Sequence, residues 1–477
     1  GGNNEYALRL IPLVAGIAAL ALVYLVARPL VGRWGAALAT ALLALSPSAL
    51  RYSVEVKQYS SDLAIALGLT VLAMRAGRRP GGVDGRRALA VWGAAGVVGV
   101  WCSHTAILVL VGQATVLVLQ GPRRQRWSVL GWSMPWAASF VADWWVSLRR
   151  LGQDRFLHTY WAAGFAPRGS VGAFAAWLAR VPMRLTADPA GLPVAGVSAL
   201  IVLAGLAWVL RTRPTAGAVL VLPLLVGLGA ASVGAYPLEG RMALWLLPVA
   251  LVGLAGAAVA AAAGIRRATD RVLRLDRAAH RQPTRGAGWL SALLAVAALA
   301  VVVQGPVRRV SAVAHDPATW VDLRPLLQAV RPRMAPSDAV WVHTDDAPSA
   351  EYYARSTGVI PTAVVWDGRS RQNCPGNADL ASVAGGRRVW FVFGYLASGS
   401  VTDAEAAVNA RLATMGHLLT RVRRPQASAW LWDFGAPPDA SRAASPARDV
   451  ACVSVTPAPA PAPTGLSTGP LGGGRRT

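Results

Sequence analysis

The sequence is poor in cysteine and lacks the common nucleotide-binding patterns. Its 477 residues include three cysteines, Cys102, Cys374 and Cys452, with no Cys-x-x-Cys pair and no His/Cys cluster. This argues against a structural zinc site. Neither a Gly-x-Gly-x-x-Gly pattern nor a P-loop is present, so nucleotide binding has no support. Cys374 and Cys452 either pair in an oxidising compartment or remain free thiols, and the sequence leaves both open.

Acidic residues and lysine are also scarce. There are 23 acidic and 47 basic residues, a net charge of +24, and Lys57 is the one lysine. Such a charge first suggests nucleic-acid binding. However, 54% of the residues are hydrophobic and the mean hydropathy is +0.42, which is too apolar for an ordinary soluble domain. The composition therefore favours a membrane protein with no nucleic-acid partner, and the richness in Arg, Ala, Gly and Pro suggests a bacterial genome.

Long apolar runs recur through residues 1–305, and each approaches the length of about 20 residues that a membrane helix needs. No repeat with a fixed period is visible. We expect a polytopic α-helical membrane domain at 1–305, a small α/β domain at 306–434 and a disordered Ala/Pro-rich tail at 435–477. About ten helices are expected in the first of these, at 7–31, 35–52, 60–76, 88–102, 104–120, 127–148, 191–210, 215–235, 241–263 and 287–305.

The distribution of arginine predicts the orientation. With the N-terminus outside, the inward loops hold nineteen arginines, whereas outward segments of similar total length hold nine basic residues. The C-terminal α/β domain is then extracytoplasmic. The chain begins with Gly1 and enters a helix without a basic region or cleavage site, so this start is not a signal peptide. We expect a fragment that lacks the first membrane helix and the first external loop.

The outward loop at 51–62 carries the densest polar sequence between apolar spans. Charges at a membrane boundary are costly unless they are paired or used. A compact ammonium on Lys57 can act as a phosphate ligand. The alternative is a solvated loop in which Glu55 pairs with Lys57 and Ser60 or Ser61 caps the next helix. The residues alone leave both interpretations open.

Three further outward residues are candidates. His104 lies in a very short turn and is either structural or functional. Arg241 opens a span and either anchors it at the interface or binds a phosphate bidentately. Asp143 is an acid within a membrane helix and hence a candidate site, although we favour a pairing with Arg149 or Arg150.

The long outward segment 149–190 mixes aromatic, acidic and basic residues around His158 and Trp161. Such residues can stack on and hydrogen-bond a sugar, and the same mixture describes an amphipathic helix lying on the bilayer. Periodicity does not separate the two. We take Tyr59, His104, His158 and Trp161 as candidate sugar or acceptor contacts.

Four segments in order resemble a known group of enzymes. Residues 6–12 (Tyr-Ala-Leu-Arg-Leu-Ile-Pro) resemble the Arg-Leu-Pro start of the second helix of GT-C glycosyltransferases. Residues 53–59 resemble the Ser-x-Glu-x-(Lys/Arg)-x-Tyr external turn of the bacterial protein-mannosyltransferase-like family, which depends on lipid-phosphate sugars. Residues 161–167 and 236–241 also resemble its recurring external segments. The resemblance covers about residues 1–305.

The resemblance implies transfer of a sugar from a polyprenyl-phosphate donor to an acceptor on the outer face of the membrane. The catalytic base in such enzymes lies in the first external loop, which is expected upstream of Gly1, so no base is assigned and Glu55 is not given that role. The matched motifs imply that Arg9, Glu55, Lys57 and Arg241 hold the donor phosphate and shape the pocket, with Lys57 the strongest candidate.

The mechanism expected from the resemblance is a direct displacement that inverts the anomeric centre. Cations stabilise charge on the departing lipid phosphate, a carboxylate takes the proton of the acceptor hydroxyl, and apolar grooves hold the prenyl chain. The expected partners are membrane lipids, the lipid-linked donor and an envelope glycan, lipid or protein acceptor in a bacterial plasma membrane. Metal dependence is left open. The alternatives are a transporter or flippase for a lipid-linked sugar and a non-catalytic envelope scaffold.

Beyond residue 311 helices and strands alternate, which predicts a mostly parallel sheet. Helices are expected at 319–334, 350–357 and 403–416, and strands at 338–343, 363–366, 388–393 and 427–434. His343, Asp345, Asp346 and Glu351 suggest a metal site, but we favour helix-capping acids at a strand–helix turn. No metal site is therefore predicted.

Overall fold

A computed structural model describes most of the chain, with gaps. The longer described stretches are residues 5–78, 83–149, 155–278, 323–343, 387–394 and 399–435, with shorter pieces between 304 and 396. The chain divides into two compact units, Gly1–His315 and Asp316–Thr477. The predicted helix at 287–305, apart from its last two residues, and the tail beyond residue 435 lie outside the described residues, as do Cys374 and Cys452.

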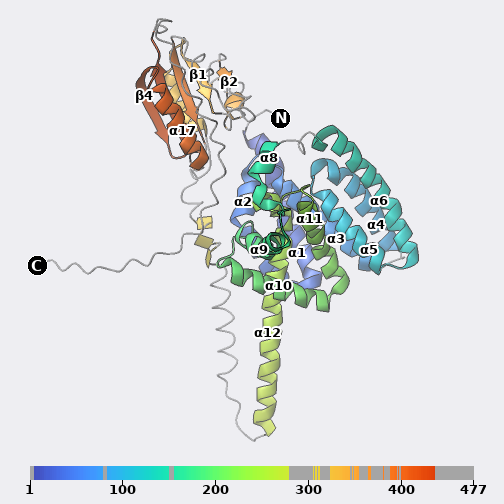
Figure 1. Ribbon diagram of the computed structural model, residues 1–477. Coiled ribbons are helices and arrows are strands. Elements are labelled where there is room, and N and C mark those ends of the chain that lie inside the picture. The colour runs from blue at the N-terminus through green and yellow to red at the C-terminus, as the bar shows by residue number, and fades with distance from the viewer. Residues whose placement is uncertain are drawn as a thin grey trace, which may run out of the picture. The chain divides into compact units, whose positions relative to one another are not determined.

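The first unit is helical (Figure 1). Its elements are α1 (Glu5–Ala44), α2 (Pro47–Val54), α3 (Tyr59–Arg78), α4 (Val83–Cys102), α5 (Ala106–Gln120), α6 (Arg123–Asp143), the π-helical turn η1 (Trp144–Leu148), α8 (Arg155–Tyr160), η2 (Ala162–Gly164), α9 (Val171–Ala187), α10 (Ala195–Thr212), α11 (Pro214–Ser232), η3 (Gly240–Leu246) and α12 (Leu247–Ala278).

Five described helices are long and apolar enough to cross a membrane, namely Glu5–Ala44, Tyr59–Arg78, Ala195–Thr212, Pro214–Ser232 and Gly240–Ala268. The apolar helix α5 is shorter than these. Helices α4 and α6 also match predicted spans, but arginines in their first turns shorten the apolar stretch. The predicted class, a multi-pass helical membrane protein followed by a small α/β unit, is confirmed.

The predicted helix 35–52 is wrong in its extent. Within α1 the backbone breaks at Gly32, where φ is +74°, a conformation that glycine adopts without steric cost. The helix that follows ends at Ala44, and α2 begins afresh at Pro47. Ser46 is the N-cap of α2, since its hydroxyl accepts a hydrogen bond from the Ala49 amide at 3.3 Å. Serine as the N-cap followed by proline is a strong helix start.

A buried polar chain connects three helices of this unit. The Trp92 indole N–H of α4 donates to Gln113 Oε1 of α5 at 2.8 Å, and Gln113 Nε2 donates to Thr70 Oγ1 of α3 at 3.0 Å. Thr70 in turn donates to the Ala66 carbonyl at 2.7 Å. Interhelical hydrogen bonds of this kind hold membrane helices together where the hydrophobic effect does not.

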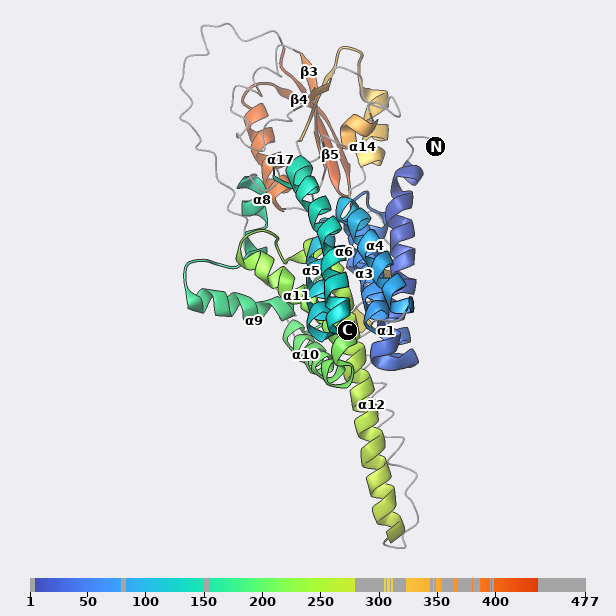
Figure 2. The same cartoon turned by 90° about the vertical axis from the view of Figure 1, so that its right-hand side faces the viewer.

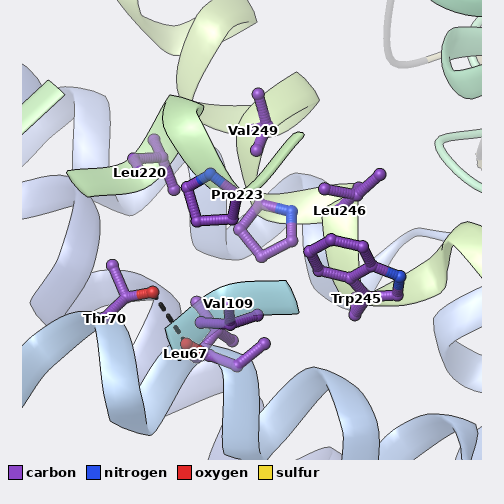
Figure 3. A pocket seen from close by; sticks show the side chains of 10 residues that line it. Leu67, Thr70, Val109, Leu220, Pro223, Trp245, Leu246 and Val249 are labelled. Carbon is purple, nitrogen blue, oxygen red and sulfur yellow. Dashed lines mark hydrogen bonds between the residues drawn. The ribbon is translucent and has the colours of Figure 1, made fainter. Parts of the chain in front are cut away.

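Thr70 also borders a small cavity between α3, α5, α11 and the start of α12. The cavity has a volume of about 20 Å³ and is lined mainly by apolar side chains, including Val109, Pro223 and Trp245 (Figure 3). A space of this size holds about one water molecule. A prenyl chain therefore does not fit in this cavity.

The long segment before α10 contains a helix that crosses the others. Helix α9 runs across the direction of the long helices, as the two views together show (Figures 1 and 2). Trp177 and Val181 on one face of α9 are buried, whereas Val171 and Leu178 are exposed. This arrangement fits the amphipathic interfacial helix that was one interpretation of residues 149–190.

The second unit contains a five-stranded sheet in the order β2-β1-β3-β5-β4. The strands are β1 (Ala339–Val342), β2 (Val364–Trp366), β3 (Arg388–Phe393), β4 (His417–Arg424) and β5 (Ala427–Asp433), and the helices are α14 (Leu323–Val330), with the 3₁₀ turn η5 (Arg331–Arg333), and α17 (Gly399–Leu412). Trp390 and Val392 of β3 join the apolar cluster that includes α14. Val389 and Phe391 join the cluster on the other face, which includes Leu412 of α17.

The prediction of a mostly parallel sheet is wrong. Strand β1 pairs in parallel with β2 and β3, but β5 pairs antiparallel with both β3 and β4. Strand β4 was missed because its residues are polar and mostly exposed, with Arg421, Arg423 and Arg424 in place of an alternating apolar pattern. Two residues separate β4 from β5, which is the length of a hairpin turn and too short for a parallel crossover.

Candidate functional site

The outward loop between α2 and α3 has a different pairing from the one considered from sequence. Arg51 Nε lies 3.5 Å from Glu55 Oε2, one helical turn along the chain. Glu55 therefore pairs with Arg51, and the exposed Lys57 forms no ion pair among the described residues. Ser60 lies within the first turn of α3 and not at an N-cap position. The loop thus presents a single ammonium group to its surroundings.

Arg241 lies among aromatic rings from three parts of the chain. Its guanidinium carbon is 5.0 Å from the ring centroid of Trp161, 5.8 Å from that of Tyr59 and 5.9 Å from that of Tyr160. Tyr52 contacts Arg241 through its side chain and packs edge-to-face on Tyr59 with a centroid separation of 4.9 Å. We call these five residues, Tyr52, Tyr59, Tyr160, Trp161 and Arg241, the arginine–aromatic cluster.

The guanidinium of Arg241 is half-buried and has unused donor capacity. Its Nε is buried and makes no hydrogen bond to the described residues, and no carboxylate of the described residues forms an ion pair with it. A guanidinium presents five N–H donors in a planar fork that matches the oxygens of a phosphate. A buried donor without a partner is costly, so this group is suited to receive an anion.

Backbone contacts between two distant segments place the cluster. The Leu238 amide donates to the Gly164 carbonyl at 2.9 Å, and the Ala166 amide donates to the Ala231 carbonyl at 3.2 Å. A Cβ at Gly164 would lie 2.8 Å from Cβ of Pro237, so glycine permits this close approach. Residues 161–167 and 236–241, which were noted separately in the sequence, therefore lie side by side.

The turn before Arg241 also requires glycine. Gly240 has φ of +49°, and a Cβ there would lie 3.2 Å from Asp188 Oδ2. Asp188 is fixed in turn, because Ser48 Oγ donates to its Oδ1 at 2.8 Å. Ser46 Oγ donates to the neighbouring Pro189 carbonyl at 3.1 Å. These two bonds connect α2 to the residues that follow α9, and Gly240 in the turn before Arg241 packs against Asp188 of that segment.

The electrostatic surroundings of the cluster are mixed. Burial raises the pKa of Tyr52, while Arg51 and Arg241 oppose that rise and Glu55 and Asp188 add to it. The Tyr52 hydroxyl is thus kept protonated, and it can accept a hydrogen bond from the guanidinium of Arg241. Burial likewise raises the pKa of Glu239, and the charge of Arg184 opposes this.

A second group of polar residues gathers at the turn 103–105. His104 Nε2 lies 3.8 Å from Asp143 Oδ2, and the Asp143 side chain is 4% exposed. The favoured pairing of Asp143 with Arg149 is not found, because the Arg149 guanidinium lies over the Trp145 ring at 4.5 Å, and Arg150 lies outside the described residues. His104 belongs to this turn, and in the described part of the chain its ion-pair partner is Asp143 and not a residue of the arginine–aromatic cluster.

Asp62, in the first turn of α3, was not predicted as a site residue. Its side chain contacts Ser103, whose hydroxyl is 2.9 Å from that of Thr105. The carboxylate is buried, and its Oδ1 has no hydrogen-bond partner among the described residues. An acid inside an apolar run was the available sequence signal.

The other predicted site residues are dispersed. The ring of His158 stacks on Phe165 with centroids 5.2 Å apart. Arg9 is exposed in α1, seven residues before Gly16, which packs against Ser53 of α2. At 1.5 Å rise per residue it lies about 10 Å farther along the helix. Of the predicted residues, the structure therefore gathers Tyr59, Trp161 and Arg241. Glu55 lies near them because it pairs with Arg51, whose guanidinium lies over the ring of Tyr52.

Sequence reasoning missed Tyr52, Tyr160 and Asp188. Tyr52 and Tyr160 each lie next to a predicted motif, and Asp188 lies near the end of the outward segment 149–190. Their convergence depends on the packing of α2, α8 and the end of α9. In the second unit, Asp346 accepts a hydrogen bond from the Gly394 amide at 2.6 Å and is structural. Asp345 lies outside the described residues, and among those described no three His, Cys, Asp or Glu residues gather as a metal site.

Residues 1–147 match the family model described as dolichyl-phosphate-mannose-protein mannosyltransferase. No curated protein matches the chain. Among solved structures, the chain is similar to ArnT from Cupriavidus metallidurans in the apo state, with 13% identity over 90% of this chain and 85% of that chain and a TM-score of 0.45.

The chain is also similar to the oligosaccharyltransferase AglB of Archaeoglobus fulgidus. The complex with an inhibitory peptide and a dolichol-phosphate shares 12% identity over 89% of this chain and 63% of that chain, at a TM-score of 0.45. The apo form shares 13% identity over 91% and 64%, at the same TM-score of 0.45. The chain therefore spans less than two thirds of the archaeal protein. Residues 1–147 are thus similar to the dolichyl-phosphate-mannose-protein mannosyltransferase family, in agreement with the sequence resemblance to GT-C glycosyltransferases that depend on lipid-phosphate sugars.

Proposed function

We propose that this protein transfers a sugar from a polyprenyl-phosphate donor to an acceptor hydroxyl on the extracytoplasmic face of a bacterial plasma membrane, with inversion at the anomeric carbon. The observation that carries the proposal is the half-buried guanidinium of Arg241, which has aromatic neighbours and unused donors. The acceptor is an envelope glycan, lipid or protein.

The position of the cluster along the chain supports the proposed face. Tyr59 begins α3 and Arg241 lies at the start of η3, both at helix ends that the arginine distribution assigns to the outside. The donor's phosphate sits at the headgroup level while its prenyl chain remains in the hydrocarbon. A cation at a helix end meets that phosphate without crossing the bilayer.

The chemistry requires stabilisation of charge on a departing lipid phosphate. As the bond between the anomeric carbon and the phosphate oxygen breaks, Arg241 donates hydrogen bonds to the phosphate where negative charge develops. Lys57 in the adjacent outward loop supplies a second cation. Glu55 holds Arg51 and shapes the loop, so it is not assigned as the base that takes the proton of the acceptor hydroxyl. Trp161 and Tyr160 keep Arg241 oriented and offer faces for a sugar.

The distribution of polar groups favours transfer over transport of a lipid-linked sugar. A transporter places its substrate site near the middle of the bilayer on broken helices. Here the mid-helix polar chain of Trp92, Gln113 and Thr70 has its hydrogen bonds satisfied internally. The unsatisfied cation lies at a helix end. Surface chemistry is therefore the better match.

The test is sugar transfer by the full chain in proteoliposomes, with a panel of polyprenyl-phosphate hexoses and pentoses as donors and a membrane extract as acceptor. Arg241→Ala is expected to lower the transfer rate by at least about 100-fold, the loss typical when one preorganised transition-state donor is removed. The control is Arg180→Ala, because Arg180 is exposed on α9. Equal rates for Arg241→Ala and the unaltered protein would contradict the proposal.

A further inference from the structure

A cationic pocket lies beside the Gly32 break of α1 and the C-terminal end of α3, whereas Tyr59 of the arginine–aromatic cluster begins α3. It has a volume of about 480 Å³, and Arg28 of α1 with Arg75 and Arg78 of α3 contribute to its wall. Helix α3 is about 28 Å long at 1.5 Å per residue, so this pocket lies on the far side of the membrane from Tyr59. The two sites are therefore separate.

The three arginines are unusual in their lack of partners. Each is exposed, and the described residues form no ion pair or hydrogen bond with their guanidinium groups. Among the described residues, no acidic side chain lines the pocket. Like charges converging on one hollow repel each other, and an anion bound between them relieves that repulsion.

Along both helices, the residues that line the pocket change from apolar to basic in the direction of the chain. Helices α1 and α3 pack against each other (Figure 2). On α1, Leu25 precedes Arg28 by one turn, and on α3, Val71 and Met74 precede Arg75 and Arg78. In the predicted topology, α3 and the part of α1 before Gly32 run from the outside inward. The apolar residues therefore lie at the depth of the hydrocarbon and the arginines at the inner headgroup level.

We propose that this pocket binds the phosphate of an anionic glycerophospholipid from the inner leaflet, with an acyl chain against Leu25, Val71 and Met74. A volume of 480 Å³ is in the range of small-molecule sites. Basic pockets between membrane helices on the cytoplasmic side are suited to anionic lipid headgroups. The apolar portion selects a lipid over a soluble phosphate, because a soluble phosphate leaves that surface unused.

Native mass spectrometry of the full chain in mixed micelles tests this site. The probes are dioleoyl-phosphatidylglycerol, zwitterionic dioleoyl-phosphatidylcholine and soluble glycerol 3-phosphate. We expect phosphatidylglycerol to bind tightest, with an affinity that falls as salt rises. If glycerol 3-phosphate binds equally well, the ligand of the pocket is a soluble anion and not a lipid. If phosphatidylcholine binds equally well, the negative charge of the headgroup does not determine binding. Either result overturns the proposal.

Variants connect the binding to these arginines. Arg28→Gln is expected to weaken phosphatidylglycerol binding about fivefold, and the double variant Arg75→Gln/Arg78→Gln by about 25-fold, given roughly 1 kcal/mol per arginine near an anionic lipid. The control is Arg86→Gln/Arg87→Gln, which removes two exposed arginines from the inward end of α4 outside the pocket. The single variant keeps most inward arginines, so membrane topology is retained. If the control weakens phosphatidylglycerol binding as much as Arg75→Gln/Arg78→Gln does, the basic inner face attracts the lipid in general. That result would overturn the proposed site.

Discussion

The guanidinium of Arg241 lies over the indole of Trp161, with 5.0 Å between the guanidinium carbon and the ring centroid. The two residues are distant in sequence and are joined by the contact of residues 161–167 with 236–241. A cation over a tryptophan face is stabilised by about 0.5–2 kcal/mol. Trp161 thus restricts the guanidinium to one orientation without occupying its N–H donors, which leaves them available to an anion.

This relationship predicts a positioning role for Trp161. Trp161→Leu should lower sugar transfer about fivefold or more. Without the indole, Arg241 loses about 1 kcal/mol or more of the cation–π energy that holds its guanidinium in place. Trp161→Phe should recover most of that loss. The measurement is the transfer rate against donor concentration in proteoliposomes, which separates kcat from KM.

Trp34 supplies a matched control for Trp161. Its ring also carries a guanidinium, that of Arg33 at 5.3 Å, but it lies beside the Gly32 break on the predicted inward side. Trp34→Leu should leave transfer unchanged. If both tryptophan variants lose transfer equally, the effect of Trp161 is one of general stability and the positioning role is wrong.

Lys57 remains the strongest cation candidate from sequence. Lys57→Ala in the full-length protein should abolish sugar transfer, by about 100-fold if its ammonium stabilises the departing phosphate. Membrane insertion should stay intact, since Lys57 is exposed and outside the described spans. The neighbouring exposed Gln58→Ala is the control. Transfer by Lys57→Ala at the unaltered rate would refute the role.

Much of the fold could be predicted because the length and periodicity of apolar segments determine where most helices and buried strands form. Strand β3 was predicted with its observed bounds, and α3 within a few residues, since each is a contiguous apolar segment. The break at Gly32 was missed because an apolar run does not reveal a φ of +74°. Strand β4 was missed because an exposed edge strand needs no apolar face.

The candidate site could be predicted only in part. Arg241, Tyr59 and Trp161 were identified because they lie in recognisable motifs. Their mutual contact could not be predicted, since it depends on which loops pack together. Glu55 pairs with Arg51, and not with Lys57 as one of the two open interpretations had it, because a helix extends to Val54 and places Arg51 and Glu55 one turn apart.

The half-buried carboxyl group of Glu239 predicts a dependence of stability on pH. Burial raises its pKa above the ordinary value of 4.5, so the folded state binds the proton more tightly than the unfolded state. The free energy of unfolding should therefore fall as pH rises from about 4.5 through the raised pKa. Glu239→Gln should remove this dependence and unfold at a higher temperature than the unaltered protein at neutral pH.

Thermal unfolding in detergent, followed by tryptophan fluorescence at acidic and neutral pH, measures this effect. The difference between Glu239→Gln and the unaltered protein should grow with pH. Asp84→Asn, at the exposed start of α4, should not show the same growth. A neutral-pH stability lower than that of the unaltered protein would mean that pairing of Glu239 with Arg184 outweighs its burial.

Asp338 should stabilise the second unit by joining the start of β1 to β3. Its Oδ2 accepts hydrogen bonds from the Ala335 amide at 2.9 Å and from the Trp390 indole at 3.1 Å, and Arg388 Nε lies 3.1 Å from its Oδ1. Asp338→Ala should destabilise the unit by about 3 kcal/mol, because charged hydrogen bonds are lost together. Hydrogen exchange in the full chain should accelerate in β1 and β3 but not in α3, whereas exposed Arg423→Ala should change neither.

The close approach of α10 and α12 gives the sharpest test of packing in the membrane unit. A Cβ at Gly205 would lie 1.8 Å from the Gly253 carbonyl oxygen and 2.6 Å from the Ala257 amide nitrogen. Backbone atoms cannot move aside as a flexible side chain does, so the helices must separate. Gly205→Leu should cost about 3 kcal/mol or more, at the upper end of overpacking, and should lower the unfolding temperature in detergent. Gly196→Leu in the same helix is the control, because no atom lies within 4 Å of its Cβ position. Similar unfolding temperatures for the two variants would show that small residues do not set the distance between these helices.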